Sequence, residues 1–256
     1  SADGTVIAIG SKNYEAGTKI GRVDVYKYNG SAWQQRGGGI VGEAQGDQSG
    51  FSVSLSADGS VVAIGAPFND DNGNDSGHVR VYQYDGSSWE KIAGNINGEA
   101  QSDQSGYSVS LSADGSVLAI GSRLNRGNGP NSGHVRVFQI AKRNPWIQQG
   151  LNIVDDAVGD ESGSSVSLNG NGSMLAIGSP KHNDNRGTVD VYIFENSKWI
   201  SELSSYSLSD GYSSGYSVSL SKSGSVLAVS ATGFGASRGK VDIQQKLENG
   251  GWGRLG

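Results

Sequence analysis

The stretch FSVSLSADGSVVAIGAP, at residues 51–67, decides the fold because it recurs along the chain. Close copies are YSVSLSADGSVLAIGS at 107–122, SSVSLNGNGSMLAIGSP at 164–180 and YSVSLSKSGSVLAVS at 216–230, and SADGTVIAIGS opens the chain at residue 1. Self-similarity at a nearly fixed period is the signature of a repeat architecture. The sequence therefore predicts five copies of one structural unit.

Each unit has the pattern of four strands. Residues 51–56 alternate apolar residues with serine, the period of two that is typical of a strand. The Asp-Gly pair at 58–59 predicts a hairpin turn, because both positions tolerate the positive φ angles of tight turns. Residues 61–65 form the continuous apolar run of a strand buried on both faces. Residues 78–84 alternate again, and a last strand surrounds Trp89.

Four antiparallel strands per unit match the blade of a β-propeller. A single four-stranded sheet cannot bury both of its faces, so neighbouring units must stack. The predicted fold class is therefore all-β, a β-propeller of four-stranded antiparallel blades with five repeats seen. We predict one propeller domain over residues 1–256, with repeats at approximately 1–50, 51–106, 107–163, 164–215 and 216–256. The five blades form either a five-bladed ring or part of a larger ring.

Composition excludes several classes of protein. The 256 residues include 41 glycines and 4 prolines, which favours a turn-rich β fold. The net charge of −5 argues against nucleic-acid binding, which favours a basic face. The apolar runs are far too short to span a membrane, so we expect no membrane insertion. Cysteine is absent, so disulfides do not stabilise the fold.

The repeated phrase, followed by Gly-His-Val-Arg-Val, resembles the FG-GAP repeat of integrin α-subunit-type propellers. It is most similar to the bacterial and algal version, in which a tryptophan-bearing outer strand leads to a Gly-Asp-x-x-Gly loop. That loop is present at residues 46–50 and 159–163. The resemblance covers the whole chain and implies a β-propeller whose loop face carries ligand.

The resemblance also implies a calcium site in the first turn of each repeat, but the ligands are missing. Of the acidic pattern of that turn, the second repeat keeps only Asp58 and Gly59, with serine or valine at Ser54, Ser56 and Val62. Calcium requires six to eight oxygen ligands. We therefore predict no metal and no cofactor. The alternative is weak calcium binding by the acidic loop that holds Asp70, Asp71 and Asp75.

No catalytic residues are predicted. His78 and His134 occupy the same position in two repeats, which indicates a structural role. His182 occurs once, and no residue near it stands at a spacing that is typical of a catalytic motif. Residues 235–239 match G-x-S-x-G by letter, but a nucleophile elbow requires a following helix, and here a strand follows. The sequence therefore predicts that the chain is not an enzyme.

The five tryptophans fall once per repeat: Trp33, Trp89, Trp146, Trp199 and Trp252. Their constant register favours packing between blades, because aromatic side chains bury large areas. Sugar rings also stack on aromatic faces, so a carbohydrate-binding, lectin-like propeller remains an alternative function.

Acidic residues gather in the two loop sets that leave each blade at one end. An acidic face attracts basic partners, and variable loops on a rigid scaffold are typical of binding sites. We therefore predict a non-enzymatic extracellular or surface module for adhesion, structural assembly or protein binding. Its partner would be a protein or a neighbouring subunit; after the lectin, a propeller hydrolase is the third alternative. The predicted partner-binding residues are Glu43, Asp47, Asp70, Asp71, Asp75, Asp103, Asp155, Asp156, Asp160 and Asp184.

Three N-x-[ST] sequons lie in predicted turns or loops, at Asn29, Asn74 and Asn171. Acceptors for N-glycosylation lie in surface loops of secreted proteins. They are the glycosylation candidates, and they favour an extracellular or cell-surface location.

Overall fold

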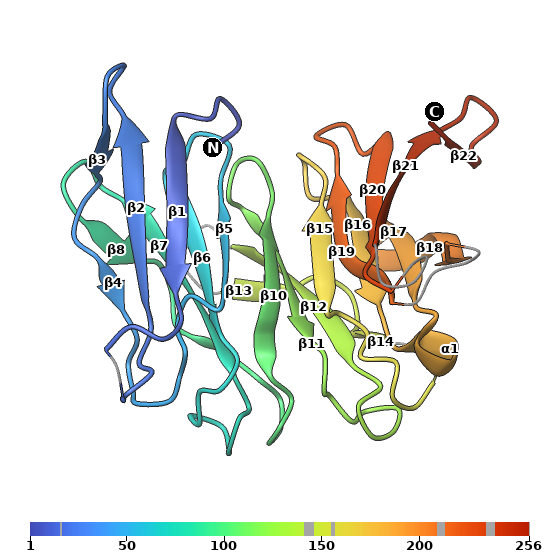
Figure 1. Ribbon diagram of the computed structural model, residues 1–256, viewed down its shortest axis with the longest axis horizontal. Coiled ribbons are helices and arrows are strands. Elements are labelled where there is room, and N and C mark those ends of the chain that lie inside the picture. Colours follow the sequence, from blue (N-terminus) through green and yellow to red (C-terminus); the bar gives the residue numbers. More distant parts are fainter. Residues whose placement is uncertain (16, 141–145, 155–156, 209–212, 234–238, 256) are drawn as a thin grey trace.

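The computed structural model describes residues 1–15, 17–140, 146–154, 157–208, 213–233 and 239–255. Over these residues the chain is almost entirely β, with one short helical turn, α1 (His182–Asn185) (Figure 1). The all-β prediction is confirmed. Within the same residues, no helix has the length and apolar character needed to span a membrane.

The strands form five separate antiparallel sheets, which we number as blades 1 to 5. Blade 1 contains β1 (Val6–Ser11), β2 (Arg22–Tyr28), β3 (Trp33–Gln35) and β4 (Ile40–Val41). Blade 2 contains β5 (Ser52–Leu55), β6 (Val61–Ala66), β7 (His78–Tyr84), β8 (Trp89–Lys91) and β9 (Ile96–Asn97). Blade 3 contains β10 (Ser105–Leu111), β11 (Val117–Ser122), β12 (His134–Ile140), β13 (Trp146–Gln148) and β14 (Ile153–Val154).

Blade 4 contains β15 (Ser165–Leu168), β16 (Met174–Ser179), β17 (Thr188–Glu195) and β18 (Lys198–Tyr206). Blade 5 contains β19 (Ser214–Leu220), β20 (Val226–Ala231), β21 (Lys240–Lys246) and β22 (Trp252–Arg254). Blades 2 to 5 each run through four consecutive strands, as predicted. The short strands β4, β9 and β14 add a third partner to β2, β7 and β12, respectively.

The turns between the first two strands of a blade are wider than a two-residue hairpin. In blade 2 five residues separate β5 from β6, and of the Asp58-Gly59 pair only Gly59 has a positive φ. Asp58 shapes the turn with its side chain, because its Oδ1 accepts hydrogen bonds from the Ser60 amide and the Ser56 hydroxyl. The prediction of a turn was correct, but the two-residue type was wrong.

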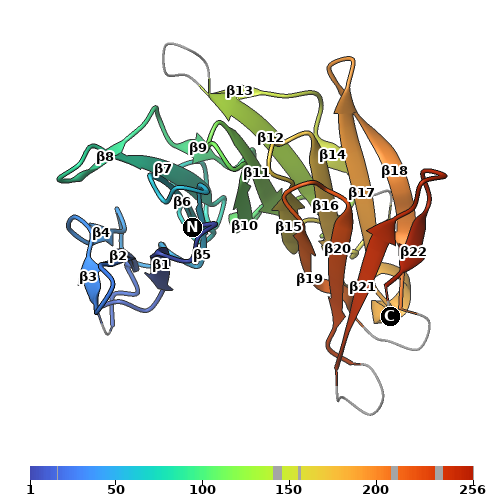
Figure 2. The same cartoon turned by 90° about the horizontal axis from the view of Figure 1, so that it is seen from above.

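The five blades follow one another around an open arc, with blades 1 and 5 at its two ends (Figure 2). Equivalent side chains differ accordingly. Ile64, Ile120 and Ile177 are fully buried between neighbouring blades, whereas Ile9, at the same position of blade 1, is 48% exposed. Val241 of blade 5 is 63% exposed, although its counterparts in the other blades are buried. The apolar core therefore lies between successive blades, in layers.

Main-chain contacts join the blades. Near the arc's inner edge, Ala57 N donates to Ala113 O, and Ala113 N donates to Gly170 O, each at 2.8 Å. In blades 1 to 4, a glycine in β1, β6, β11 or β16 lies directly against the carbonyl oxygen of a glycine at the start of the next blade, as Gly65 does against Gly106. In blade 5 this glycine is replaced by Ser230.

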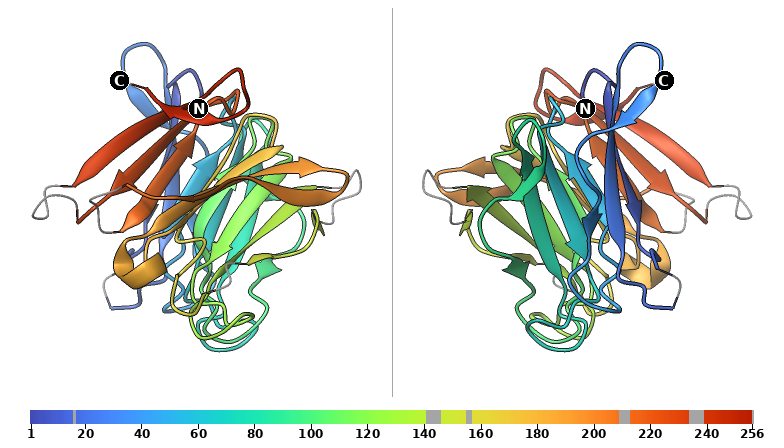
Figure 3. Two further views of the ribbon diagram at one scale, coloured as in Figure 1. Left: turned by 90° about the vertical axis from the view of Figure 1, so that its right-hand side faces the viewer. Right: turned by 90° about the vertical axis from the view of Figure 1, so that its left-hand side faces the viewer.

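Two sets of loops leave the blades at one end of the molecule. In each of blades 1 to 4, a parallel bridge joins the residue before β2, β7, β12 or β17 to a serine where the chain enters the next blade, as between Gly77 and Ser105. The side views show these loops and α1 at the end opposite both termini (Figure 3). The predicted loop face is therefore formed by segments of adjacent blades.

Candidate functional site

In the loops that lead to blades 2, 3 and 4, a buried aspartate contacts the next blade at the same place. In blade 2, Asn69 Nδ2 donates to Asp47 Oδ2 at 3.2 Å, and in blade 3 Asn125 forms the equivalent hydrogen bond with Asp103. Blade 4 has His182 where the other two blades have asparagine. The same contact then becomes a histidine–aspartate pair.

His182 Nδ1 lies 2.7 Å from Asp160 Oδ2. The carboxylate side chain is only 4% exposed, whereas that of the histidine is 31% exposed. A buried carboxylate that accepts the Nδ1–H hydrogen bond fixes the ring orientation and leaves the lone pair on Nε2. This arrangement positions a base at the protein surface, and it is the relation of histidine to aspartate in hydrolytic triads.

Two pockets adjoin this pair. His182 lines one of about 240 Å³ together with Arg186, Thr188, Ser205 and Ser207. Asp160 lines the second pocket, of about 440 Å³, with Lys181. The first pocket therefore brings a histidine, a guanidinium group and three hydroxyl groups to one place.

The turn α1 departs from a regular α-helix, because three successive residues in it have positive φ: Asn183, Asp184 and Asn185. This conformation is uncommon for residues other than glycine, and asparagine and aspartate tolerate it best. Ser205, which lines the same pocket as His182, also has a positive φ of 54°. Clusters of such residues are characteristic of functional sites.

The other two histidines lie in the core between blades. His78 and His134 begin the third strands of blades 2 and 3, and their side chains are 0% and 1% exposed. Burial lowers the pKa of His134 to about 3, and the nearby Arg136 acts in the same direction. Burial also lowers the pKa of His78, with Arg80 adding to the effect and Glu43 opposing it. Both rings are therefore neutral at neutral pH.

The residues predicted as an acidic partner-binding face divide into two groups. Asp47, Asp103 and Asp160 are buried, at 1–3% exposure, and Asp47 and Asp103 also accept hydrogen bonds from backbone amides of their own loops. They cannot present charge to a partner, so the prediction was wrong for these three. The exposed members are Glu43, Asp70, Asp71 and Asp184, and Asp75 is half-buried. Asp155 and Asp156 lie outside the described residues.

The alternative calcium ligands Asp70, Asp71 and Asp75 do not converge. Asp70 Oδ1 instead accepts a hydrogen bond from the Asp75 amide at 2.8 Å. Asp71 Oδ2 faces His78 Nδ1 at 3.4 Å. The prediction that these three carboxylates form a set was therefore wrong, because Asp71 lies against His78, at the start of β7 in the same blade.

The sequons occupy exposed turns. Asn29, Asn74 and Asn171 are all exposed, and the side-chain oxygens of Asn29 and Asn171 accept hydrogen bonds within their own turns. Their glycosylation stays a prediction.

The tryptophans pack between blades, as predicted. Trp89, Trp146, Trp199 and Trp252 each contact the apolar core that their blade shares with the preceding one. Trp89 Nε1 also donates to Arg36 O of blade 1 at 2.7 Å, and Trp199 Nε1 donates to Gln149 O at 3.1 Å. Trp33 of blade 1 is 44% exposed.

Sequence reasoning missed the role of Asp160 as the partner of His182. The two residues are 22 positions apart and belong to different blades, so no linear spacing marks them. A signal was nevertheless available. Aligning the repeats places His182 over Asn69 and Asn125, and Asp160 over Asp47 and Asp103. The aspartate is thus the same in all three pairs, and only the asparagine is replaced, by His182.

A family model described as the FG-GAP repeat matches residues 42–82. No curated protein sequence matches the chain. Among solved structures, the hydrazine synthase of Kuenenia stuttgartiensis superimposes with a TM-score of 0.57 at 12% identity, over 91% of this chain and 59% of that one. The chain thus spans less than two thirds of that protein.

Two further structures are similar. The periplasmic gluconolactonase of Pseudomonas aeruginosa gives a TM-score of 0.66 at 17% identity, over 100% of this chain and 69% of that one. A candidate 6-phosphogluconolactonase from Bacteroides uniformis gives 0.52 at 10% identity, over 98% of this chain and 81% of that one. At these identities the similarity shows the fold.

These comparisons correct the functional prediction. The chain was expected to be a non-enzymatic adhesion or assembly module and not an enzyme, yet the similar structures are named as enzymes. That expectation rested on the absence of linear catalytic motifs, and a site built from loops of adjacent blades would leave no such motif. The matched repeat and the five stacked antiparallel sheets together identify the fold. The chain is a β-propeller, and its residues 42–82 match the FG-GAP repeat.

Proposed function

We propose that the chain is a hydrolase that cleaves an ester or lactone bond beside His182. The observation that carries the proposal is the 2.7 Å contact between His182 Nδ1 and the buried carboxylate of Asp160. Asparagine occupies the histidine position in blades 2 and 3, so the scaffold does not need a titratable group there. Imidazole adds what asparagine lacks, the capacity to accept and return a proton near neutral pH.

The reaction follows from this geometry. Nε2 of His182 accepts a proton from water as the water oxygen attacks the carbonyl carbon, and Asp160 stabilises the imidazolium that forms. The C–O bond then breaks, and the imidazolium returns its proton to the departing alkoxide. An acid and an alcohol result, or a single hydroxy acid from a lactone. Arg186, on the same pocket wall, supplies positive charge for the oxyanion.

The choice of substrate class is supported by the similar structures. Two of them carry lactonase names, and both share the fold over nearly the entire chain. A lactone is an internal ester, so the chemistry required at His182 is the same for both substrate types.

The test is hydrolysis of glucono-δ-lactone and of p-nitrophenyl acetate by purified protein. His182→Asn keeps a hydrogen-bond donor for Asp160, as in blades 2 and 3, but removes the base. General base catalysis contributes about 10²–10⁴-fold, so we expect kcat to fall at least 100-fold with the fold intact. Glu90→Gln, at an exposed position of β8, is the matched control and should retain full activity.

Two results would overturn the proposal. One is a wild-type rate for both substrates that equals the buffer rate. The other is a His182→Asn variant that hydrolyses them as fast as the wild-type protein.

A further inference from the structure

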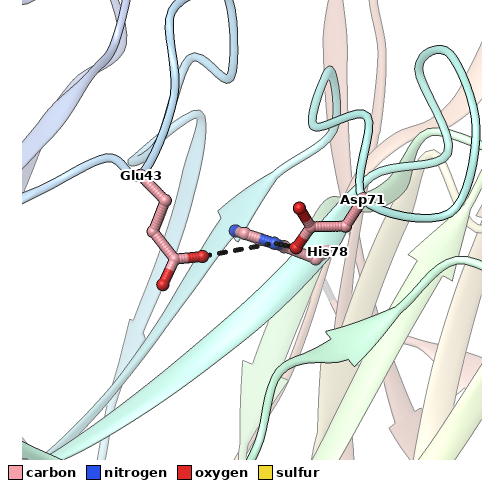
Figure 4. A group of neighbouring side chains, drawn as sticks. All are labelled: Glu43, Asp71 and His78. Carbon is pink, nitrogen blue, oxygen red and sulfur yellow. Dashed lines mark hydrogen bonds and ion pairs between the residues drawn. The ribbon is translucent and has the colours of Figure 1, made fainter.

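A second group of side chains, distant in sequence from His182, lies between blades 1 and 2. Glu43 follows β4, Asp71 belongs to the loop between β6 and β7, and His78 is the first residue of β7. One ligand atom of each lies within 4.8 Å of the other two (Figure 4). Among the described residues, this is the one group of three or more such side chains that could hold a metal ion.

The spacing of these atoms is too wide for strong hydrogen bonds. His78 Nδ1 lies 3.4 Å from Asp71 Oδ2 and 3.9 Å from Glu43 Oε2. Ordinary N–H···O bonds are about 2.7–3.2 Å long. Ligands about 2.0–2.2 Å from a tetrahedral ion are about 3.3–3.6 Å from one another. Oxygen and nitrogen atoms at this spacing leave room for a shared cation.

The histidine ring lacks adequate partners. Its side chain is completely buried, and Nε2 has no hydrogen-bond partner among the described residues. A buried polar group that is poorly paired costs about 1–3 kcal/mol. Nδ1 is the ring nitrogen that faces the two carboxylates, and a cation bound there would replace its long contacts with a ligand bond. The two carboxylates, in contrast, are 37% and 46% exposed, so the group is closed behind the ring and open toward solvent.

Some neighbouring side chains orient the ligand atoms, and others weaken the attraction of the site for a cation. Asn95 Nδ2 donates to Glu43 Oε2 at 3.0 Å and to Asp71 Oδ2 at 3.4 Å, so it holds the two ligand oxygens together. Such secondary contacts orient metal ligands. Arg80 and Lys91 each lie 3.6 Å from the other Glu43 oxygen, Oε1. These two positive charges weaken the attraction for a cation.

We propose that Glu43, Asp71 and His78 bind one divalent transition-metal ion, of the zinc class, with an open position toward solvent. One imidazole nitrogen and two carboxylate oxygens are a ligand set for zinc or a similar ion, whereas calcium takes oxygen ligands throughout. The site is independent of the hydrolase proposed at His182.

The test is titration of metal-stripped protein with ZnCl₂ by calorimetry, with CaCl₂ in parallel. It uses a His182→Asn background so that zinc cannot bind at that surface histidine. We expect one zinc ion per chain and no measurable calcium binding. Asp71→Gly, which copies the loop of blade 3, should weaken zinc binding at least tenfold. Lys91→Gln should strengthen it, because it removes an opposing charge.

Asp70→Asn is the matched control. It removes a neighbouring exposed carboxylate but keeps an oxygen for the Asp75 amide, so affinity should change less than threefold. Circular dichroism checks that each variant is folded. Absence of zinc binding by the background protein would overturn the proposal. Equal losses from Asp71→Gly and Asp70→Asn would do so as well, since they would reveal unspecific attraction to an acidic loop.

Discussion

Blades 2 and 3 are near copies in which the loop before the third strand differs at a decisive position. Each blade has a buried histidine, His78 or His134, facing a glutamate from the preceding loop, with Nδ1–Oε2 distances of 3.9 and 3.7 Å. Blade 2 adds Asp71 to this pair, and blade 3 has Gly127 at the equivalent place. The scaffold therefore conserves the histidine–glutamate contact, while a loop residue decides whether a third ligand is present.

Blade 4 shows the same principle at the neighbouring position. There the repeated asparagine–aspartate contact becomes His182–Asp160. A repeated backbone thus supports different chemistry in different blades, because each loop changes independently of the strands beneath it. The predictions below test how far the blades are equivalent and where they differ.

The largest effect is expected where the two blades are identical. An added methyl group at Gly65 or Gly121 would overlap the carbonyl oxygen of Gly106 or Gly163. The strands cannot yield without separating the blades, so each alanine variant should lose about 3 kcal/mol of unfolding free energy or more. Urea denaturation measures this loss.

Gly38→Ala is the control for these glycine variants, because nothing lies within 4 Å of the added methyl group. Its stability should change by no more than about 0.5 kcal/mol. Markedly unequal losses from Gly65→Ala and Gly121→Ala would show that the contact between blades is not equivalent in the two places.

The second prediction transfers the third ligand from one blade to the other. Gly127 does not have a positive φ, so aspartate fits its backbone, and Gly127→Asp places a carboxylate where blade 2 has Asp71. We expect zinc binding to rise from one to two ions per chain in calorimetric titration. An unchanged stoichiometry would mean that loop sequence alone does not determine the site.

The fold could be predicted from the sequence, whereas the candidate sites could not. The five sheets and the interblade tryptophans were predictable, because period and strand alternation repeat over the whole chain. The sites were not, because Glu43 and His78, like Asp160 and His182, come from different blades. Their proximity depends on how neighbouring sheets stack, which no spacing within one repeat reveals. The burial of Asp47, Asp103 and Asp160 was missed for the same reason.

A moderate effect is expected at the opposite end of the blades. Hydrogen bonds from Ser56 and Ser60 lower the pKa of Asp58. The folded-state pKa then lies below the unfolded value of about 4, so the stabilisation is present above pH 4 and is lost as pH falls through the folded-state pKa. Asp58→Ala should cost about 0.5–1 kcal/mol at pH 7, allowing for solvent screening, and progressively less as the pH falls below about 4.

Asp114 of blade 3 makes the matching contacts with Ser112 and Ser116, and its pKa is also lowered. Asp114→Ala should therefore reproduce both the loss and its pH dependence in thermal unfolding. A cost that persists unchanged at pH 2 would show that the carboxylate charge is not its source.

The smallest effect is expected for the stability of His182→Asn. Since blades 2 and 3 carry asparagine at this position, the change should alter the unfolding free energy by less than about 0.5 kcal/mol. Measured together with the activity assay, this result separates loss of the base from loss of the fold. A loss of several kcal/mol would indicate that the histidine is needed for packing.

Ser230 has a consequence for how this array of blades can be extended. In blades 1 to 4 a glycine at that position lets the backbone of the following blade approach to direct contact. The serine side chain of blade 5 fills that space, and its hydroxyl group hydrogen-bonds instead to Ser217 within the same blade. A duplicate of blade 2 or 3 therefore cannot dock on blade 5 in the way that the existing blades dock on one another. A segment that covers Val241 must therefore do so in another register or with a wider spacing between the two sheets.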